Sequence, residues 1–267
     1  MEIQLWREIL DPYQLAVDEL LVKFNHIITE HRNAGLYCPI EQVRGRVKSI
    51  SSILEKLQRK NQNINELEEK IEDIAGIRIL CQFVEDIDKV VSLIENRKDM
   101  EIKSVKDYIS NAKDSGYRSY HMIIYYDVNT IQGVRRLQAE IQIRTLAMDF
   151  WATVEHSLQY KYKQNIPDDI RERLSSAATA LLILDKEMST VRDEIMDAQE
   201  SYQAKENLVA DILNNIQNLY KVANKREIVK IQDEFYKVYQ AGDFEELSHF
   251  SRQLDIISEG YRAQSIS

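Results

Sequence analysis

Cysteine is scarce in this chain of 267 residues. Cys38 and Cys81 are the only two, and they do not form a CxxC pair. This excludes a disulfide framework and a thiolate metal site, and it fits a reducing, cytoplasmic compartment. The first residues lack the basic-then-apolar layout of a signal peptide, and no run of about 18 apolar residues occurs. We therefore expect a soluble, uncleaved protein with no membrane partner.

The common glycine-based phosphate motifs are also missing. The sequence contains neither GxxxxGK[ST] nor GxGxxG, so side chains must hold the phosphates of any bound nucleotide. Basic residues gather between Arg44 and Lys60, where six of them accompany one acidic residue. If this segment is helical, one face carries the basic stripe Lys48, Ser52, Lys56 and Arg59, at i, i+4, i+8 and i+11. The alternative reading is a solvated helix surface.

Glycine and proline are both absent from Asp168 to Ala241, which predicts that this part is all helix. Apolar residues recur there at steps of three and four, as in packed or coiled helices. This apolar seam comprises Leu174, Ala177, Leu181, Leu184, Met188, Val191 and Ile195. We expect it to be buried against the rest of the chain or a second subunit, because an exposed stripe is an aggregation hazard. Helix breaks are expected near 203–206, Asn224 and Gly242.

The charge is distributed unevenly along the chain. Residues 1–164 carry 23 basic against 25 acidic residues, or −2, and residues 165–267 carry 12 against 19, or −7, which together give the net charge of −9. The acid excess therefore lies in the C-terminal part.

The first two thirds of the chain mix helical and strand patterns. Helices are predicted over 12–31, with Pro12 in the first turn, and from Val43 to Leu57. Strands are predicted near 75–83, 101–109, 119–128 and 136–145, with a helix near 86–96, a hairpin through Gln132-Gly133 and a helix from after Thr145 to about 162. The expected fold class is α+β, a mixed β-sheet of about five strands flanked by helices, with a long helical C-terminal extension.

Two carboxylates stand out beside the predicted strands. In the segment 140–144, Glu140 shares one face with Gln142 and Arg144, whereas the two isoleucines point to the other face. An acidic residue between apolar strand positions needs a partner or a function. Asp73 precedes the first predicted strand, where an aspartate is more often a cap or turn residue. Together, the two carboxylates would suffice for Mg²⁺, which takes its remaining ligands from phosphates and water.

The segment 114–121, Asp-Ser-Gly-Tyr-Arg-Ser-Tyr-His, completes the picture of a nucleotide site. Gly116 permits a tight turn. Tyr117 offers a flat face on which a base could stack, and Arg118 and His121 supply hydrogen-bond donors for phosphate or sugar oxygens.

Four motifs occur in a fixed order: Gly45-Arg46-Val47-Lys48, Asp73-Ile-Ala-Gly-Ile-Arg78, Gly116-Tyr-Arg-Ser-Tyr-His121 and Glu140-Ile-Gln-Ile-Arg144. In this respect the chain resembles the synthetase domain of the (p)ppGpp synthetases. In its compactness it resembles the small alarmone synthetases, which are synthetase-only and RelQ-like. The resemblance covers about residues 5–200. It implies a nucleotidyltransferase-like synthetase domain over 1–200 and a helical extension of unknown role over 201–267.

The resemblance also implies an activity. Members of this family transfer the β,γ-pyrophosphate of ATP to the 3′-hydroxyl of GTP or GDP, which yields pppGpp or ppGpp and AMP. Matched motif by motif, Arg46 and Arg78 would stack on adenine, and Lys48, Ser52, Lys56 and Arg59 would bind the ATP phosphates. Asp73 and Glu140 would hold Mg²⁺, with Glu140 also taking the 3′-hydroxyl proton. Tyr117 would stack on guanine, while Lys113, His121, Gln142 and Arg144 would orient the acceptor nucleotide.

Departures from the family pattern limit what is expected. None of the five histidines precedes an aspartate, so the His-Asp motif of the hydrolase domain is missing and no hydrolase activity is expected. Some small members are tetramers activated by their own product. We therefore expect a homo-oligomer, with a tetramer favoured, but Glu41-Gln42-Val43-Arg44 lacks the aromatic residue of the activated members. The acceptor preference between GDP and GTP stays open.

The alternative function is an RNA-binding regulator of the same fold, in which the basic stripe follows single-stranded RNA. The net negative charge and the lack of aromatic residues within the stripe argue against it.

Overall fold

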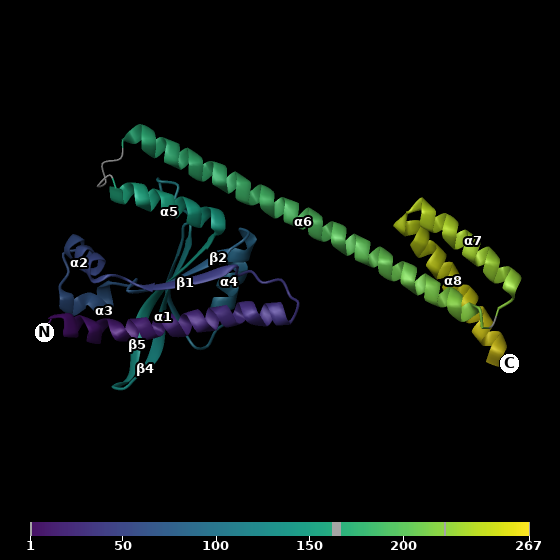
Figure 1. Ribbon diagram of the computed structural model, residues 1–267, viewed down its shortest axis with the longest axis horizontal. Helices are drawn as coiled ribbons and strands as arrows, with labels where there is room; N and C mark the ends of the chain where they lie inside the picture. Colours follow the sequence, from purple (N-terminus) through teal and green to yellow (C-terminus); the bar gives the residue numbers. More distant parts are fainter. Residues whose placement is uncertain (1, 162–166, 222, 267) are drawn as a thin grey trace. The chain divides into compact units, whose positions relative to one another are not determined.

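The computed structural model describes residues 2–161, 167–221 and 223–266 (Figure 1). They form two compact units, of which the first ends at Thr190 and the second begins at Val191. The first unit contains α1 (Glu2–Asn33), β1 (Gln42–Val47), α2 (Ile50–Arg59), α3 (Leu67–Lys70), β2 (Ala75–Cys81), α4 (Glu85–Glu95), β3 (Glu101–Asp107), β4 (Tyr120–Thr130), β5 (Gly133–Thr145) and α5 (Leu146–Lys161). Helix α6 (Asp168–Leu219) begins in this unit and continues into the second, which also holds α7 (Lys225–Ala241) and α8 (Phe244–Ile266).

The five strands form one mixed sheet in the order β1-β2-β5-β4-β3, which confirms the predicted α+β class. Strands β2 and β5 are parallel, and the other neighbouring pairs are antiparallel. The predicted hairpin is present between β4 and β5, where Thr130 pairs with Gly133. In the parallel pair, Gly76 lies opposite Glu140 and Arg78 lies opposite Gln142. This register brings residues from two distant motifs side by side.

Helix α1 supplies much of the core beneath the sheet. Tyr13, Val17, Leu20 and Phe24 are almost fully buried, as the apolar spacing predicted. The helix begins ten residues before the predicted start, so Pro12 lies inside it rather than in its first turn. Residues before the proline, including Trp6, pack against the same core. That packing holds the helix together across the proline, which removes one backbone hydrogen bond.

The predicted helix from Val43 to Leu57 is wrong in its first half, because residues 42–47 form β1. Val43 and Val47 fall on the same face with either periodicity, so their spacing alone does not distinguish a strand from a helix. Between them, a Cβ on Gly45 would lie 2.6 Å from Val17, so this glycine permits the close approach of β1 to α1. Helix α2 then begins after Ser49, whose side chain accepts a hydrogen bond from the backbone N–H of Ser52.

Helix α5 begins directly after β5, as predicted, and the start of α6 packs against it. The indole N–H of Trp151 donates to the backbone oxygen of Leu174 at 3.0 Å. The buried Thr145 donates to the buried Asp185 at 2.6 Å. The loop before β4 is held by the same helix, because a Cβ on Gly116 would lie 2.6 Å from that of Ala178. The first turns of α6 therefore fix the shape of this loop.

The apolar seam is not buried along its whole length. Leu184, Met188, Val191 and Ile195 are each about half exposed. The buried face of α6 lies one position further along and carries Ala178, Asp185 and Ser189. The expectation of burial against the rest of the chain is therefore wrong for this part of the seam. Small and polar residues made the buried face hard to recognise by hydropathy.

The second unit is a helical module with its own core. Ile212 and Ile216 of α6 pack with Phe235 of α7 and with Leu247 and Phe250 of α8. The predicted breaks at Asn224, which caps α7, and at Gly242, which ends it in a left-handed conformation, are confirmed. The predicted break near 203–206 is wrong, since α6 is continuous there. In the part of the chain that the structure describes, no helix is long and apolar enough to cross a membrane.

Gly116 and Gly133 allow a matched test of the loop packing. Both have positive φ, +88° and +109°, but only Gly116 faces a neighbouring side chain. An alanine at either position strains the backbone by about 1–3 kcal/mol. In Gly116→Ala, the new methyl group also clashes with Ala178. We predict that Gly116→Ala lowers the urea midpoint of unfolding more than Gly133→Ala. Both tryptophans of the sequence, Trp6 and Trp151, lie in the first unit, so their fluorescence reports its unfolding. An equal decrease of the urea midpoint in both variants would contradict the packing of Gly116 against Ala178.

Candidate active site

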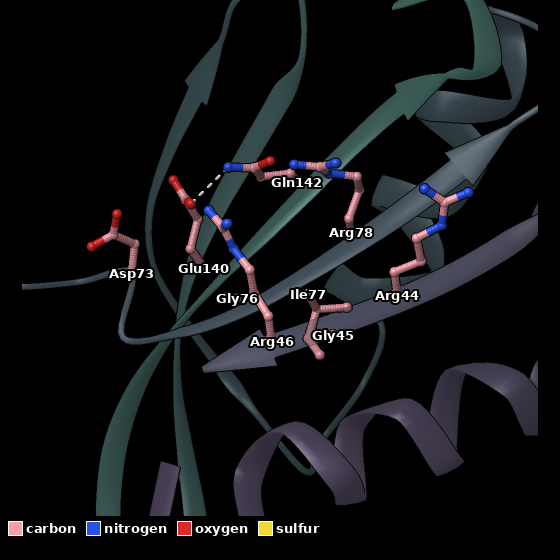
Figure 2. Close-up of a pocket in the computed structure, with 9 residues that line it drawn as sticks. All are labelled: Arg44, Gly45, Arg46, Asp73, Gly76, Ile77, Arg78, Glu140 and Gln142. Atoms are coloured by element: carbon pink, nitrogen blue, oxygen red, sulfur yellow. Dashed lines mark hydrogen bonds between the residues drawn. The ribbon is translucent and has the colours of Figure 1, made fainter. Parts of the chain in front are cut away.

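A pocket of about 280 Å³ opens on the sheet face opposite α1, between β1, β2 and β5 (Figure 2). Its lining residues are Arg44, Gly45, Arg46, Asp73, Gly76, Ile77, Arg78, Glu140 and Gln142. Figure 2 shows the carboxylates of Asp73 and Glu140 toward one end and the guanidinium groups of Arg78 and Arg44 toward the other. We call the end with the two carboxylates the acidic end and the end with Arg44 and Arg78 the cationic end, and the guanidinium of Arg46 lies beside Glu140 at the acidic end.

At the acidic end, Asp73 is paired with two lysines. Its carboxylate oxygens lie 3.0 Å from Nζ of Lys48 and 2.9 Å from Nζ of Lys56. Burial would raise the pKa of the Asp73 carboxyl, but the hydrogen bonds from Lys56 and Lys48 outweigh burial and lower it. The two lysines therefore point into the site. This favours a nucleotide pocket over an exposed track for RNA.

Glu140 belongs to a closed ring of five hydrogen-bonded side chains. His121 Nδ1 and Gln142 Nε2 lie 2.9 and 2.8 Å from its two carboxylate oxygens. His121 Nε2 lies 2.9 Å from the hydroxyl of Tyr117, and Arg144 donates to that hydroxyl at 3.3 Å. Arg144 also donates to Gln142, which closes the ring. Four of the five residues were predicted to bind the acceptor nucleotide, and the structure brings them together around Glu140.

The ring keeps the Glu140 carboxylate charged. Burial would raise its pKa, and the hydrogen bonds from His121 and Gln142 outweigh burial, so that the pKa lies below its ordinary value. The negative charge of Asp73 acts in the opposite direction and raises the pKa, which places the two carboxylates within electrostatic reach of each other. Two ionised carboxylates facing one pocket are a donor set that suits a hard divalent cation such as Mg²⁺.

Tyr117 lies in the loop between β3 and β4, among rings and a cation. Its ring meets those of Tyr108 and His121 edge to face, with centroids 6.1 and 5.9 Å away. Lys113 Nζ lies 4.8 Å from the centre of its ring. Arg118, in contrast, donates to the backbone oxygen of Ile109 and supports the loop. The loop therefore presents an aromatic ring and a lysine next to the Glu140 ring.

At the cationic end, three arginines surround Asp149, which the sequence analysis missed. Its carboxylate lies 3.0 Å from Arg78, 3.5 Å from Arg144 and 3.8 Å from Arg44. Asp149 is buried in the first turn of α5. An acidic residue there looks like an ordinary favourable charge at a helix N-terminus, so nothing in the local sequence marked it.

The other predicted residues lie at the border of the site. Ser52 is in the first turn of α2, where its side chain accepts a hydrogen bond from Ser49 at 2.8 Å. Arg46, on β1, lines the pocket beside Gly76. Arg59 is exposed in the last turn of α2 and does not line the pocket. Lys48 lies before α2 rather than on it, so the basic stripe is not one helix face, although Lys48 and Lys56 still meet at Asp73.

A sheet with two carboxylates facing one pocket, lysines paired with one of them and a neighbouring aromatic loop is an arrangement that suits nucleotide binding. Comparison with known proteins agrees. Residues 45–165 match the family model described as the region found in RelA / SpoT proteins. The chain is 47% identical over 205 residues to the GTP pyrophosphokinase YjbM of Bacillus subtilis, covering 77% of this chain and 97% of that protein. It is 43% identical over 192 residues to YwaC of the same organism, covering 71% and 91%.

Solved structures lead to the same family. The small alarmone synthetase 1 of B. subtilis bound to its product pppGpp superposes with a TM-score of 0.70 and 48% identity, over 72% of this chain and 98% of that one. A GTP pyrophosphokinase family protein from Streptococcus pneumoniae gives a TM-score of 0.69 and 49% identity, over 73% and 96%. The chain belongs to the RelA/SpoT family of GTP pyrophosphokinases, as a small alarmone synthetase.

The lowered pKa of Asp73 predicts how its contribution to stability depends on pH. Ionised Asp73 stabilises the fold above its unfolded pKa of about 3.9, and this contribution is lost as the pH falls through the lower folded pKa. Asp73→Asn should therefore destabilise the first unit at pH 7, and the difference from the wild type should close below about pH 4. Tryptophan fluorescence in urea measures this, with the exposed Asp114→Asn as control. If the difference in stability between Asp73→Asn and the wild type did not change with pH, the pairing of Asp73 with the two lysines would be contradicted.

Proposed function

We propose that this chain transfers the β,γ-pyrophosphate of ATP to the 3′-hydroxyl of GTP or GDP, forming pppGpp or ppGpp and AMP. The observation that carries the proposal is the position of the Glu140 ring directly beside the Asp73–lysine cluster, across the parallel register of β2 and β5. A donor nucleotide and an acceptor nucleotide can then meet on one face of the sheet. The relatives YjbM and YwaC are GTP pyrophosphokinases.

ATP occupies the side formed by β1, β2 and α2. Arg46 and Arg78 lie on neighbouring strands and offer guanidinium planes to the adenine. Lys48 and Lys56 exchange part of their pairing with Asp73 for the phosphates. Ser52, in the first turn of α2, adds a hydroxyl where the N-terminal end of the helix favours negative charge. Arg59, further along α2, has the weakest structural support of this group.

The guanine nucleotide occupies the side formed by the loop before β4 and by β5. Tyr117 stacks on the base, with Lys113 beside it, and the donors of His121, Gln142 and Arg144 meet the sugar and phosphates. Glu140 accepts the proton of the 3′-hydroxyl as that oxygen attacks the β-phosphorus, and the bond from this phosphorus to the α–β bridging oxygen breaks as AMP leaves. The pKa of Glu140 lies below its ordinary value, so the side chain is ionised at neutral pH, the state in which a carboxylate can accept a proton.

Asp73 and Glu140 are the residues that would hold Mg²⁺. A bound Mg²⁺ supplies neutralisation of the charge that builds up on the phosphate oxygens. The protein contributes positioning and cationic stabilisation, which account for most of the catalysis in phosphoryl transfer. Both substrates are soluble cytoplasmic nucleotides, so we assign the reaction to the cytoplasm.

Incubation with ATP and either GTP or GDP tests the proposal directly. We expect AMP and a guanosine product carrying a 3′-diphosphate in equal amounts, and a loss of both when Mg²⁺ is chelated. Comparing the two acceptors determines the preference. A folded protein that forms no AMP with either acceptor would refute the proposed function.

The half-exposed part of the apolar seam supports a homo-oligomer, and the family resemblance favours a tetramer. Exposed apolar residues of α5 add to it, with Phe150 63% and Leu146 46% exposed. Exposed apolar side chains grouped in this way favour contact with another subunit.

Glu140→Gln tests the proton acceptor. The change keeps the shape of β5 but removes the charge, so we predict that transfer falls by about 10²–10⁴-fold while ATP affinity changes little. Product formation and calorimetric ATP binding measure the two effects. Glu101→Gln is the control, because Glu101 is exposed and pairs with Arg136. A Glu140→Gln enzyme that retains full activity would exclude this role.

Tyr117→Ala tests the assignment of the guanine side. Loss of one stacking face, worth about 1–3 kcal/mol, should raise KM for the guanine nucleotide and leave KM for ATP unchanged. Tyr117→Phe keeps the ring and loses only the hydroxyl contacts with His121 and Arg144, so its KM should rise less. Equal weakening of both nucleotides by Tyr117→Ala would contradict the division of the site.

Truncation at Gln203 tests the separate role of the C-terminal module. The shortened chain keeps the part of α6 that contacts the first unit, including Ala178 and Asp185. We predict that it still synthesises (p)ppGpp. Inactivity of a truncated protein that is folded and binds ATP would show that the module completes the site.

The mass of the full chain in solution tests the homo-oligomer. We predict a mass several times 31.3 kDa. A full chain that stays monomeric at micromolar concentration would exclude the oligomer.

A further inference from the structure

Asp149 has an environment that its position in the sequence does not explain. Its side chain is 10% exposed and lies against three guanidinium groups, from Arg44 on β1, Arg78 on β2 and Arg144 on β5. A favourable charge for the helix N-terminus needs no burial and no arginine. Burial of the carboxylate among three cations indicates a role toward those cations.

The sheet register creates the need for this anion. Arg44 lies directly opposite Arg78 on the antiparallel strands β1 and β2, and like charges in opposite positions repel. Arg144 adds a third cation from β5, with a side chain that is only 2% exposed. Burial lowers the pKa of Arg144, and the charge of Arg78 lowers it further, whereas Asp149 raises it. Without Asp149, these arginines would turn away from one another.

The backbone that carries Asp149 is held in place by a helix cap and by buried neighbours. Thr145 accepts a hydrogen bond from the backbone N–H of Met148 at 3.1 Å and caps α5, and Thr145 is itself fixed by Asp185. Met148 and Trp151, on either side of Asp149, are buried. The carboxylate is therefore held at a fixed place relative to the sheet.

We propose that Asp149 is a positioning residue that holds Arg78 for the donor nucleotide and Arg144 for the acceptor nucleotide at the same time. The inference rests on the proposed function, since the roles of the two arginines come from it. Arg78 lines the pocket on the ATP side. Arg144 donates to Tyr117 and Gln142 in the Glu140 ring. Asp149 is the shared partner that links the two halves of the site.

Asp149→Asn tests this link in the full-length enzyme. The amide keeps the size of the side chain and removes the charge, so KM should rise about tenfold for ATP and about tenfold for the guanine nucleotide, or about 1.4 kcal/mol each. Asp149→Glu, which restores the charge, should recover part of both losses. Asp86→Asn is the matched control, because Asp86 is also buried but pairs with Lys89 and Tyr37 and does not line the pocket.

A double substitution separates positioning from general packing. In an Arg78→Gln background, Asp149→Asn should still raise KM for the guanine nucleotide but should no longer raise KM for ATP. Unchanged KM values in Asp149→Asn, or equal increases of both KM values in Asp86→Asn, would overturn the inference. If Asp149→Asn does not fold, Asp149→Glu provides the test. An Asp149→Glu enzyme that is as stable as the wild type but has KM values raised tenfold or more for both nucleotides would also overturn the inference. Failure of the proposed function is distinguishable, because the wild type would then form no AMP.

Discussion

The parallel pairing of β2 with β5 is the constraint on which the site depends. It connects motifs more than sixty positions apart in the sequence, so that Arg78 lies opposite Gln142 and Gly76 lies opposite Glu140. The glycine leaves space above the sheet where the pocket opens. A shift of this register by one residue would turn Glu140 into the core and an isoleucine into the pocket. Buried isoleucines on the core face of both strands make that shift unfavourable.

Most charges on this frame pair with one another. Asp73 pairs with two lysines, Asp149 pairs with three arginines, and Glu140 accepts two hydrogen bonds within its ring. Unpaired charges at such partly buried positions would be costly. In the proposed reaction, the phosphates of the two nucleotides replace these carboxylates as partners of the cations.

Much of this arrangement was predictable from the sequence, and the exceptions have physical reasons. Alternation along 140–144 placed Glu140, Gln142 and Arg144 on one face correctly, because a side-chain period of two is unambiguous. Val43 and Val47 fit a helix as well as a strand, so β1 was missed until its pairing with β2 was seen. Asp149 was missed because its partners come from three separate strands. The buried face of α6 was misplaced because it uses Ala178, Asp185 and Ser189 instead of large apolar residues.

A crystal structure of the protein with Mg²⁺, an ATP analogue that cannot transfer its β,γ-pyrophosphate, and GDP would test the central claim most directly. The account predicts adenine between Arg46 and Arg78, guanine on Tyr117, and the 3′-oxygen of GDP between Glu140 and the β-phosphorus of the analogue. Density for adenine on Tyr117, or for a 3′-oxygen remote from Glu140, would contradict the division of the site across β2 and β5.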